Sequence, residues 1–315
     1  METSKMNQIL RVARMYYEMH LGQLEIGKRE NISKSTVSRL LKNAEELGFV
    51  KITVEKPLCF VADLEEALVE TFGLRRAVVI PDMVGDPELL LGDVCRTAAE
   101  ELPGYIKDNM TIAAAWGRTM NELVRNLAPM PRSHVKVVQI NGGTSRLLYD
   151  TGVNHMIRKI TEAVDGTGYL LPAPAVVDNV YIAEAIKSDS QIRSAINLAE
   201  KADIGLWSVG KVTRDSILYE LMGFPDNEFS RIKKQAAGDV CSHYLNADGA
   251  VADESFDCRV VAVAADAILK IGTKILIVSG NDKAVALESA LKGGFADVLY
   301  VDEPLARKVL KKPEN

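Results

Sequence analysis

Three short segments of this 315-residue sequence combine glycine with hydroxyl, amide or cationic side chains, which is a chemistry suited to binding anions. They are Trp116–Thr119, Asn141–Ser145 and Ser279–Lys283. Glycine lets the backbone approach a ligand closely, and backbone N–H groups, hydroxyls and a lysine ammonium can all donate to phosphate oxygens. The alternative is that these glycines only serve tight turns. The ligand contacts that we predict here are Trp116, Gly117, Thr119, Asn141, Gly142, Gly143, Thr144, Ser145, Gly280, Asn281, Asp282 and Lys283.

Each of these segments follows a strand-like run, so a sheet would position them. Strand-like and helical runs alternate along the body of the chain, which predicts an α/β fold with a mostly parallel sheet covered by helices on both faces. In such sheets ligands bind at the carboxyl ends of the strands. The predicted strands are 77–80, 111–115, 135–140, 169–171, 204–209, 274–278 and 298–301, and the predicted helices lie near 87–102, 119–127, 152–164 and 282–292, with a short one at the C-terminus.

A second set of polar residues lies on a predicted helix over residues 35–42. Val37, Leu40 and Leu41 share its inward face, while short hydroxyls and long cations project outward. Such a face suits the DNA major groove, where small polar groups approach base edges and cations reach phosphates. The alternative is a small three-helix subdomain with a solvated polar face. The predicted DNA contacts are Gln23, Lys34, Ser35, Thr36, Ser38, Arg39 and Lys42.

The residues around this helix follow a helix-turn-helix pattern. Helices are predicted over 6–20 and 23–30, and Asn31 tolerates the left-handed corner that must follow the second one. Ser33 fits the N-cap of the third helix. Residues 48–54 then alternate like a short strand or wing, which predicts a winged head.

The charge distribution fits a DNA-binding head on an effector body. Residues 1–56 contain ten Lys and Arg and seven Asp and Glu, a net charge of +3; since the whole chain carries −5, the remainder carries −8. This balance excludes a uniformly basic nucleic-acid coat but allows a local basic patch. We therefore divide the chain into a DNA-binding domain (1–56), a linker or dimerisation helix (57–74) and an effector domain (75–315).

The linker contains a predicted amphipathic helix over residues 62–72. Its apolar stripe consists of Leu64, Ala67, Leu68 and Phe72. One interpretation is that the stripe pairs with a second copy of the chain, because symmetric DNA half-sites require a two-fold dimer. The other is that it packs on its own body, and the sequence leaves both open.

Several classes of site and location are not expected. The cysteines are far apart and form no CxxC pair, so we predict neither a disulfide framework nor a metal site, and no cofactor. The N-terminus has no apolar signal segment, and no apolar run approaches the about 20 residues of a transmembrane helix. We therefore expect a cytoplasmic protein without membrane contact. The four cysteines are Cys59, Cys95, Cys241 and Cys258.

These residues carry a resemblance to a known family. Gln23, Ile26, Ile32–Leu41 and Gly48–Val50 resemble the DNA-binding domain of the sorbitol-operon regulator (SorC) family. The body resembles that family's sugar-binding domain, which is Rossmann-like and similar in fold to ribose-5-phosphate isomerase and glucosamine-6-phosphate deaminase. The matching stretches of the body are Ala115–Thr119, Asn141–Thr144, Leu171–Pro174, Gly238–Cys241 and Ser279–Lys283.

The resemblance implies a transcriptional regulator, usually a repressor, that a phosphorylated sugar releases from its operator. It also implies a homo-oligomer, commonly a dimer of dimers. For Asp239 the alternative to a ligand contact is a structural role, as a helix N-cap or a surface acid. Carried over by position, the resemblance places the effector phosphate against Gly142, Gly143, Thr144 and Lys283, and the sugar against Asn141, Asp239 and the Pro172–Pro174 segment.

Some residues depart from the family's pattern. In the deoxyribonucleoside-regulator branch, a lysine at the position of Asn141 forms a Schiff base with the sugar; asparagine has no nucleophilic amine, so no covalent adduct is expected there. Gly27 and Glu30 stand where the head usually has alanine and leucine, which predicts a looser second helix. The alternative function is a phosphosugar isomerase, but no histidine lies in the three glycine-containing segments, and we predict no catalytic residue.

Overall fold

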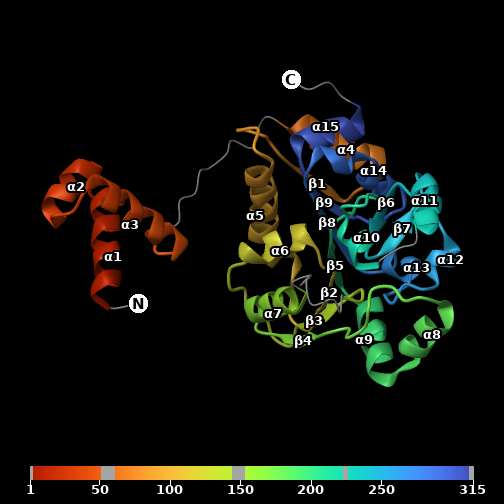
Figure 1. The fold of residues 1–315 in the computed structure, drawn as a ribbon. Coiled ribbons are helices and arrows are strands. Elements are labelled where there is room, and N and C mark those ends of the chain that lie inside the picture. Colours follow the sequence, from red (N-terminus) through yellow and green to blue (C-terminus); the bar gives the residue numbers. More distant parts are fainter. Residues whose placement is uncertain (1–2, 51–60, 144–152, 223–225, 312–315) are drawn as a thin grey trace. The chain divides into compact units, whose positions relative to one another are not determined.

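The computed structural model describes residues 3–50, 61–143, 153–222 and 226–311 (Figure 1). The chain divides into two compact units, Met1–Pro57 and Leu58–Asn315. The described part of the N-terminal unit is helical, and the C-terminal unit is a mixed α/β domain.

Three helices form the described part of the N-terminal unit: α1 (Thr3–Tyr17), α2 (Gln23–Glu30) and α3 (Lys34–Glu46). Their apolar faces meet in one core that includes Ile9, Ile26 and Val37. The bounds of α2 are those predicted, whereas α1 begins and ends three residues earlier and α3 continues to Glu46. Most of the predicted wing lies outside the described residues.

The corner between α2 and α3 has the predicted geometry. Asn31 adopts the left-handed conformation with φ 54° and ψ 45°, and Ser33 Oγ accepts a hydrogen bond of 3.1 Å from the Thr36 N–H. A Cβ on Gly27 would lie 2.7 Å from the Ile32 carbonyl oxygen, so this glycine permits the chain to close the corner.

Glu30 also stabilises the second helix. Its carboxylate accepts two hydrogen bonds from the Arg11 guanidinium, of 3.0 and 2.8 Å, and so ties α2 to α1. The expectation of a looser second helix stays a prediction, which this ion pair opposes. Gly27 and Glu30 replace side-chain packing with a close backbone approach and a bidentate ion pair.

A seven-stranded parallel sheet forms the centre of the C-terminal unit, in the order β1-β9-β8-β5-β2-β3-β4. The predicted parallel α/β fold is confirmed. A separate antiparallel hairpin consists of β6 (Gly238–Val240) and β7 (His243–Leu245). The strands of the sheet are β1 (Arg76–Ile80), β2 (Thr111–Ala114), β3 (Lys136–Gln139), β4 (Thr167–Tyr169), β5 (Ile204–Trp207), β8 (Thr273–Val278) and β9 (Val298–Asp302).

Helices cover both faces of this sheet (Figure 1). Val78 and Ile80 of β1 belong to one apolar core and Ala77 and Val79 to the other, as the two-residue period of a strand requires. One core is closed by α5 (Pro87–Tyr105), α6 (Arg118–Arg125) and α7 (Val153–Val164), and the other by α4 (Ala62–Phe72), α9 (Ser190–Glu200), α14 (Ala284–Lys292) and α15 (Glu303–Leu310).

Further short helices surround these layers. They are α8 (Val180–Ser188), α10 (Ile217–Met222), α11 (Asp226–Gln235), α12 (Glu254–Asp257), α13 (Ala265–Ile268) and the 3-10 turn η2 (Asn281–Lys283). None of the helices in the described ranges is long and apolar enough to span a membrane.

The packing of α4 decides between the two interpretations of its apolar stripe. Leu64 and Leu68 are fully buried in the core that also contains Val79 and Leu305. Glu65 Oε1 accepts a hydrogen bond of 2.9 Å from the Val79 N–H, so the helix also covers the edge strand β1. The stripe packs on its own body, and Leu64 and Leu68 are not available to a second copy.

Candidate functional site

The chain changes direction across the sheet between β2 and β5, which are neighbours. From β2 it continues to β3 and β4 on one side, and from β5 to β8 and β9 on the other. In open parallel sheets a ligand crevice forms at such a switch point, outside the carboxyl ends of the strands. The turns after β2 and β5 therefore flank the position where a ligand is expected.

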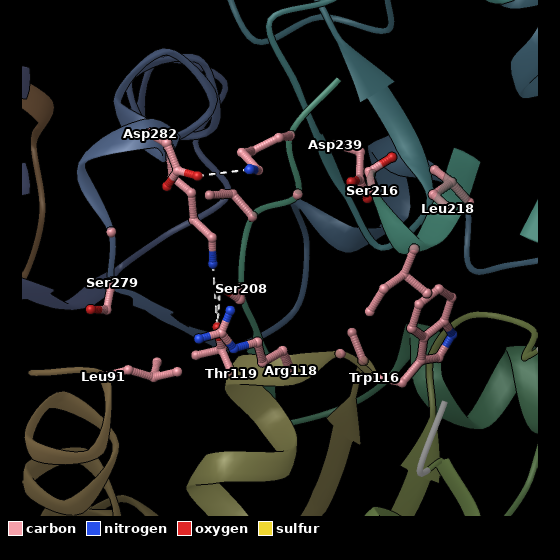
Figure 2. Close-up of a pocket in the computed structure, with 18 of the residues that line it drawn as sticks. Leu91, Trp116, Arg118, Thr119, Ser208, Ser216, Leu218, Asp239, Ser279 and Asp282 are labelled. Carbon is pink, nitrogen blue, oxygen red and sulfur yellow. Dashed lines mark hydrogen bonds and ion pairs between the residues drawn. The ribbon is translucent and has the colours of Figure 1, made fainter. Parts of the chain in front are cut away.

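A cavity of about 620 Å³ lies at this position (Figure 2). Its volume falls within the range of about 300–1,000 Å³ typical of small-molecule sites. It is lined by the turns after β2, β5 and β8, by the start of α5 and α10, and by the β6–β7 hairpin. Of the predicted ligand contacts, the cavity brings together Trp116, Gly117, Thr119, Asn141, Asp239, Gly280, Asn281, Asp282 and Lys283.

Arg118, Lys211 and Lys283 gather at one end of the cavity, which we call the cation end. Two of these cations have carboxylate partners. Lys211 Nζ lies 2.7 Å from Asp282 Oδ2, and Arg118 pairs with Glu88. The mouth of the cavity is thus lined by ion pairs, with the third cation behind them.

Lys283 has a different environment. Its Nζ donates to Thr119 Oγ1 at 3.4 Å (Figure 2), and across the described residues no carboxylate lies within ion-pair distance of it. Burial lowers the pKa of Lys283; the nearby charges of Arg118 and Lys211 act in the same direction, and Asp282 opposes them. A half-buried ammonium without an ion-pair partner attracts an anionic ligand.

The Ser279–Lys283 turn places this lysine at the start of a helix. Gly280 has φ +112°, a conformation that favours glycine, and its N–H donates to Asp302 Oδ2 at 2.7 Å. Lys308 Nζ donates to the Asn281 carbonyl oxygen at 3.1 Å. The turn leads through η2 into α14, and the first N–H groups of a helix lack partners within it. This segment therefore offers the predicted cation and helix start, although the N–H groups of Gly280 and Lys283 already have partners.

The described residues of the turn after β3, Asn141–Gly143, offer neither a cation nor the start of a helix. The Gly142 N–H donates to the Val261 carbonyl oxygen at 2.8 Å, and the Gly143 N–H to that of Ala173 at 2.9 Å. A Cβ on Gly142 would lie 2.4 Å from the Pro174 carbonyl oxygen, so this glycine serves a close approach of two chain segments. Both N–H groups are thus already paired, and their contact with a phosphate stays a prediction that this geometry does not favour. Gly142, Gly143 and Pro174 do not line the cavity, and Thr144 and Ser145 lie outside the described residues.

Asn141, Asp239 and Ser242 form another part of the cavity wall, which we call the amide floor. Asn141 Nδ2 donates to Ser242 Oγ at 2.8 Å, and the Ser242 N–H donates to Asp239 Oδ2 at 3.3 Å. Burial raises the pKa of the Asp239 carboxyl to about 6. Asp239 lies on β6, is no helix N-cap or exposed acid, and lines the cavity; its contact with a sugar stays a prediction.

Several cavity residues were missed by the sequence prediction. Lys211 had a signal, because Gly210-Lys211 directly follows a predicted strand. Ser242 had none: it lies at φ +76°, where glycine is the usual residue, in a hairpin that was not predicted. Within the described ranges, no group of three or more His, Cys, Asp or Glu could hold a metal ion. The other missed residues are Pro87, Glu88, Leu91, Ala115, Arg118, Ser208, Val209, Gly210, Asp215, Ser216, Ile217, Leu218, Cys241 and Ser279.

In the N-terminal unit, α3 has the predicted two faces. Val37, Leu40 and Leu41 are buried. Contact with DNA stays a prediction. Of its predicted contacts, Lys34, Ser35, Ser38, Arg39 and Lys42 are exposed, whereas Gln23 and Thr36 are half-buried.

Known proteins resemble this chain both in sequence and in fold. Residues 56–311 match a domain family described as "Putative sugar-binding domain". The chain is 32% identical over 310 residues to the "Deoxyribonucleoside regulator" of Bacillus subtilis, a match that covers 98% of this chain and 99% of the relative. It is 26% identical over 306 residues to the "Sorbitol operon regulator" of Klebsiella pneumoniae, with 96% and 97% covered. The crystal structure of full-length SorC from Klebsiella pneumoniae matches with a TM-score of 0.75 at 24% identity, over 97% of this chain and 98% of that one.

A switch-point cavity in a sugar-binding domain, with relatives named as regulators over nearly the full length, defines a sugar-responsive transcriptional regulator and not an enzyme. The chain belongs to the SorC family, which confirms the resemblance found in the sequence.

Proposed function

We propose that the protein represses an operon of carbohydrate catabolism, and that a phosphorylated sugar bound in the cavity releases it from operator DNA. The observation that carries this proposal is Lys283, a half-buried ammonium that donates to a hydroxyl and makes no ion pair with a described carboxylate, directly before the start of α14. A phosphate there gains a cation and helix N–H donors, a combination suited to a dianion.

In this proposal residues 1–56 form a winged helix-turn-helix domain that binds double-stranded DNA. α3 is the recognition helix, because its exposed face combines Ser35 and Ser38 with long cations. Arg39 and Lys34 reach bases or phosphates from this face, and the short hydroxyls approach base edges. The half-buried Gln23 and Thr36 lie at the helix starts and support the contact.

Release of DNA requires that the effector favours an arrangement of the protein that binds DNA poorly. A coupling free energy of about 1–3 kcal/mol, ordinary for such proteins, corresponds to an about 5- to 150-fold change in operator affinity. We propose that two copies pair on symmetric half-sites and that dimers assemble into tetramers, through surfaces other than Leu64 and Leu68. The protein then acts in the cytoplasm. We also propose that the fold of its effector domain is similar to the folds of ribose-5-phosphate isomerase and glucosamine-6-phosphate deaminase.

The test is a gel shift with DNA from upstream of the protein's own operon, run with phosphorylated sugars and with the same sugars lacking phosphate. We expect a retarded complex that phosphorylated sugars weaken by about 5- to 150-fold and free sugars leave unchanged. Equal release by phosphorylated and free sugars would overturn the phosphate site, and failure to bind the upstream DNA would overturn the regulatory role.

The DNA-binding face is tested separately with Arg39→Ala. If Arg39 reads a base, operator binding should weaken by about 1–3 kcal/mol. If it contacts a phosphate, binding to all sequences should weaken alike and the salt slope should fall by about one. Arg193→Ala, which removes an exposed arginine of α9, is the control. Unchanged affinity of Arg39→Ala at two salt concentrations would exclude Arg39 from the DNA contact.

A further inference from the structure

Asn141 presents a buried acceptor to the cavity. The residue is 3% exposed, its Nδ2 donates to Ser242 Oγ, and its backbone carbonyl accepts a hydrogen bond of 2.7 Å from Gln139 Nε2. Side chain and backbone are therefore both held in place. Within the described part of the chain, Asn141 Oδ1 accepts no hydrogen bond. Buried polar atoms without a partner are rare in folded proteins, so this oxygen indicates a donor that arrives with the ligand.

The rest of the amide floor supports a donor as the missing partner. Asp239 contributes a carboxylate, and Ser242 a hydroxyl whose oxygen already accepts from Asn141. Cys241 and Ser242 lie at φ +51° and +76°, conformations that residues other than glycine rarely adopt, and this turn brings the serine hydroxyl to the amide. A phosphate, which offers only acceptors when ionised, does not fit beside these oxygens, whereas a sugar hydroxyl does.

The sheet order sets how far this floor lies from the cation end. Asn141 follows β3 and Lys283 follows β8, and β2 and β5 lie between them. Three strand spacings of about 4.8 Å separate β3 and β8 by roughly 14 Å. In Figure 2, Asp239 of the floor and Asp282 of the cation end likewise lie on different sides of the cavity. A ligand with its phosphate at Lys283 therefore presents the part remote from the phosphate to Asn141.

We propose that Asn141 determines specificity: its Oδ1 accepts a hydrogen bond from a sugar hydroxyl at the end remote from the phosphate. This inference rests on the proposed function and commits the donor to the hydroxyl at C2, which is next to the carbon farthest from the phosphate and is absent from a 2-deoxy sugar. A 2-deoxy counterpart fills the same space but leaves the buried oxygen unpaired, which is why hydrogen-bonding sites reject ligands that lack the matching group.

Two sets of four probes separate the phosphate contact from the hydroxyl contact at Asn141. The first set is ribose 5-phosphate, 2-deoxyribose 5-phosphate, ribose and 2-deoxyribose. The second set is glucose 6-phosphate, 2-deoxyglucose 6-phosphate and their two free sugars. Binding of each to the full-length protein is measured by calorimetry. We expect the 2-hydroxylated phosphosugar of at least one set to bind at least about tenfold more tightly than its 2-deoxy counterpart. The loss of affinity on removing the phosphate tests the proposed function. The loss of affinity on removing the hydroxyl tests the proposed role of Asn141.

The variant Asn141→Leu keeps the approximate volume and removes the acceptor. Its affinity for the hydroxylated probe should fall to that for the deoxy probe, so that the ratio approaches one. Asn126→Leu, which removes an amide outside the cavity that donates to the Glu122 carbonyl, should keep the wild-type ratio.

Equal binding of hydroxylated and deoxy probes by the wild-type protein would overturn the inference and leave the phosphate site intact, even if Asn141→Leu does not fold. Persistence of the wild-type ratio in a folded Asn141→Leu would also overturn it. If neither set shows any binding, both the inference and the proposed phosphosugar effector fail.

Discussion

Two glycine-containing turns of the body look alike in sequence and differ in structure. The Ser279–Lys283 turn follows β8, leads into a helix and contributes a half-buried cation to the cavity. The Asn141–Gly143 turn follows β3, and its two glycine N–H groups donate to carbonyl oxygens of other segments. The first is suited to an anion, and the second contributes only the Asn141 side chain to the cavity.

The difference shows that glycine alone does not identify a phosphate site. Gly280 is required by its positive φ, whereas Gly142 is required because the Pro174 carbonyl comes too close for any Cβ. What distinguishes the two turns is the Lys283 side chain, because the Gly280 N–H, like those of Gly142 and Gly143, already has a partner in a segment distant in sequence. Each of the following changes tests one side of this comparison.

The largest effect is expected for Lys283→Ala. Removing one member of a charge contact that the bound ligand buries costs about 2–5 kcal/mol, so the affinity for a phosphosugar should fall by that amount and the effector response should disappear. Effector-free DNA binding should persist, because Lys283 belongs to the C-terminal unit. Calorimetry with a phosphosugar and a gel shift without it measure the two quantities.

Lys292→Ala is the matched control for that change. Lys292 is the exposed last residue of α14, the helix that Lys283 precedes; it is paired with Glu288 at 2.8 Å, and its loss should leave the effector response unchanged. A normal response of Lys283→Ala would mean that the phosphate lies elsewhere. Joint loss of folding and DNA binding would show that Lys283 is a structural residue.

The next effect concerns the turn after β3. Gly142→Ala would place a Cβ 2.4 Å from the Pro174 carbonyl oxygen, and such overpacking should lower the free energy of unfolding by about 1–3 kcal/mol. Urea denaturation measures it. Gly104→Ala, in α5 with no atom within 4 Å of the added Cβ, should instead stabilise the protein by about 0.4–1 kcal/mol. If Gly142→Ala leaves the stability unchanged but weakens phosphosugar binding, Gly142 contacts the phosphate after all.

The same comparison explains how much could be predicted from the sequence. The strands of the parallel sheet were predictable because buried strands are continuous apolar runs, and the α2–α3 corner because Asn31 and Ser33 have specific local roles. Lys283 was predictable because it follows a strand and a glycine within five residues. These signals are local, and the structure places the corresponding elements within a few residues of the predicted bounds.

The remainder depends on contacts that no local pattern encodes. The β6–β7 hairpin has strands of three residues and a Cys241-Ser242 turn in place of the usual glycine or asparagine, so neither alternation nor turn chemistry marks it. Lys211 reaches the cavity because β5 lies beside β8, an order that the sequence does not display. The partners of the Gly142 N–H and of the α4 stripe are likewise distant in the chain.

A smaller effect, dependent on pH, is expected for the amide floor. Burial raises the pKa of Asp239 to about 6, above its usual value of 3.8, so the folded protein holds this proton more tightly than the unfolded chain does. The contribution of this carboxyl to stability therefore falls as the pH rises from about 4 to about 6 and stays constant above. Asp239→Asn, which does not titrate there, should gain stability relative to wild type across this window. Thermal midpoints at closely spaced pH values measure it, and a constant difference would place Asp239 in a more solvated environment.

The smallest effect is expected at the mouth of the cation end, for Asp282→Asn. Its hydrogen bond from Lys211 lowers the pKa of the Asp282 carboxyl, so the pair stabilises the fold above about pH 4, and this contribution is lost as the pH falls through the lowered pKa. Because both partners are partly solvated, the loss of stability at neutral pH should be about 0.2–1 kcal/mol.

The affinity for a phosphosugar is a second quantity to measure for Asp282→Asn, and we expect it to change in the opposite direction from that in Lys283→Ala. Removing the carboxylate frees the Lys211 ammonium, so the affinity for a phosphosugar should rise slightly and become more dependent on salt. Calorimetry at two ionic strengths measures both changes. A clear fall in affinity would instead mean that Asp282 itself contacts the ligand, because an ion pair at the mouth only competes with a phosphate for Lys211, whereas a carboxylate that accepts from sugar hydroxyls adds to binding.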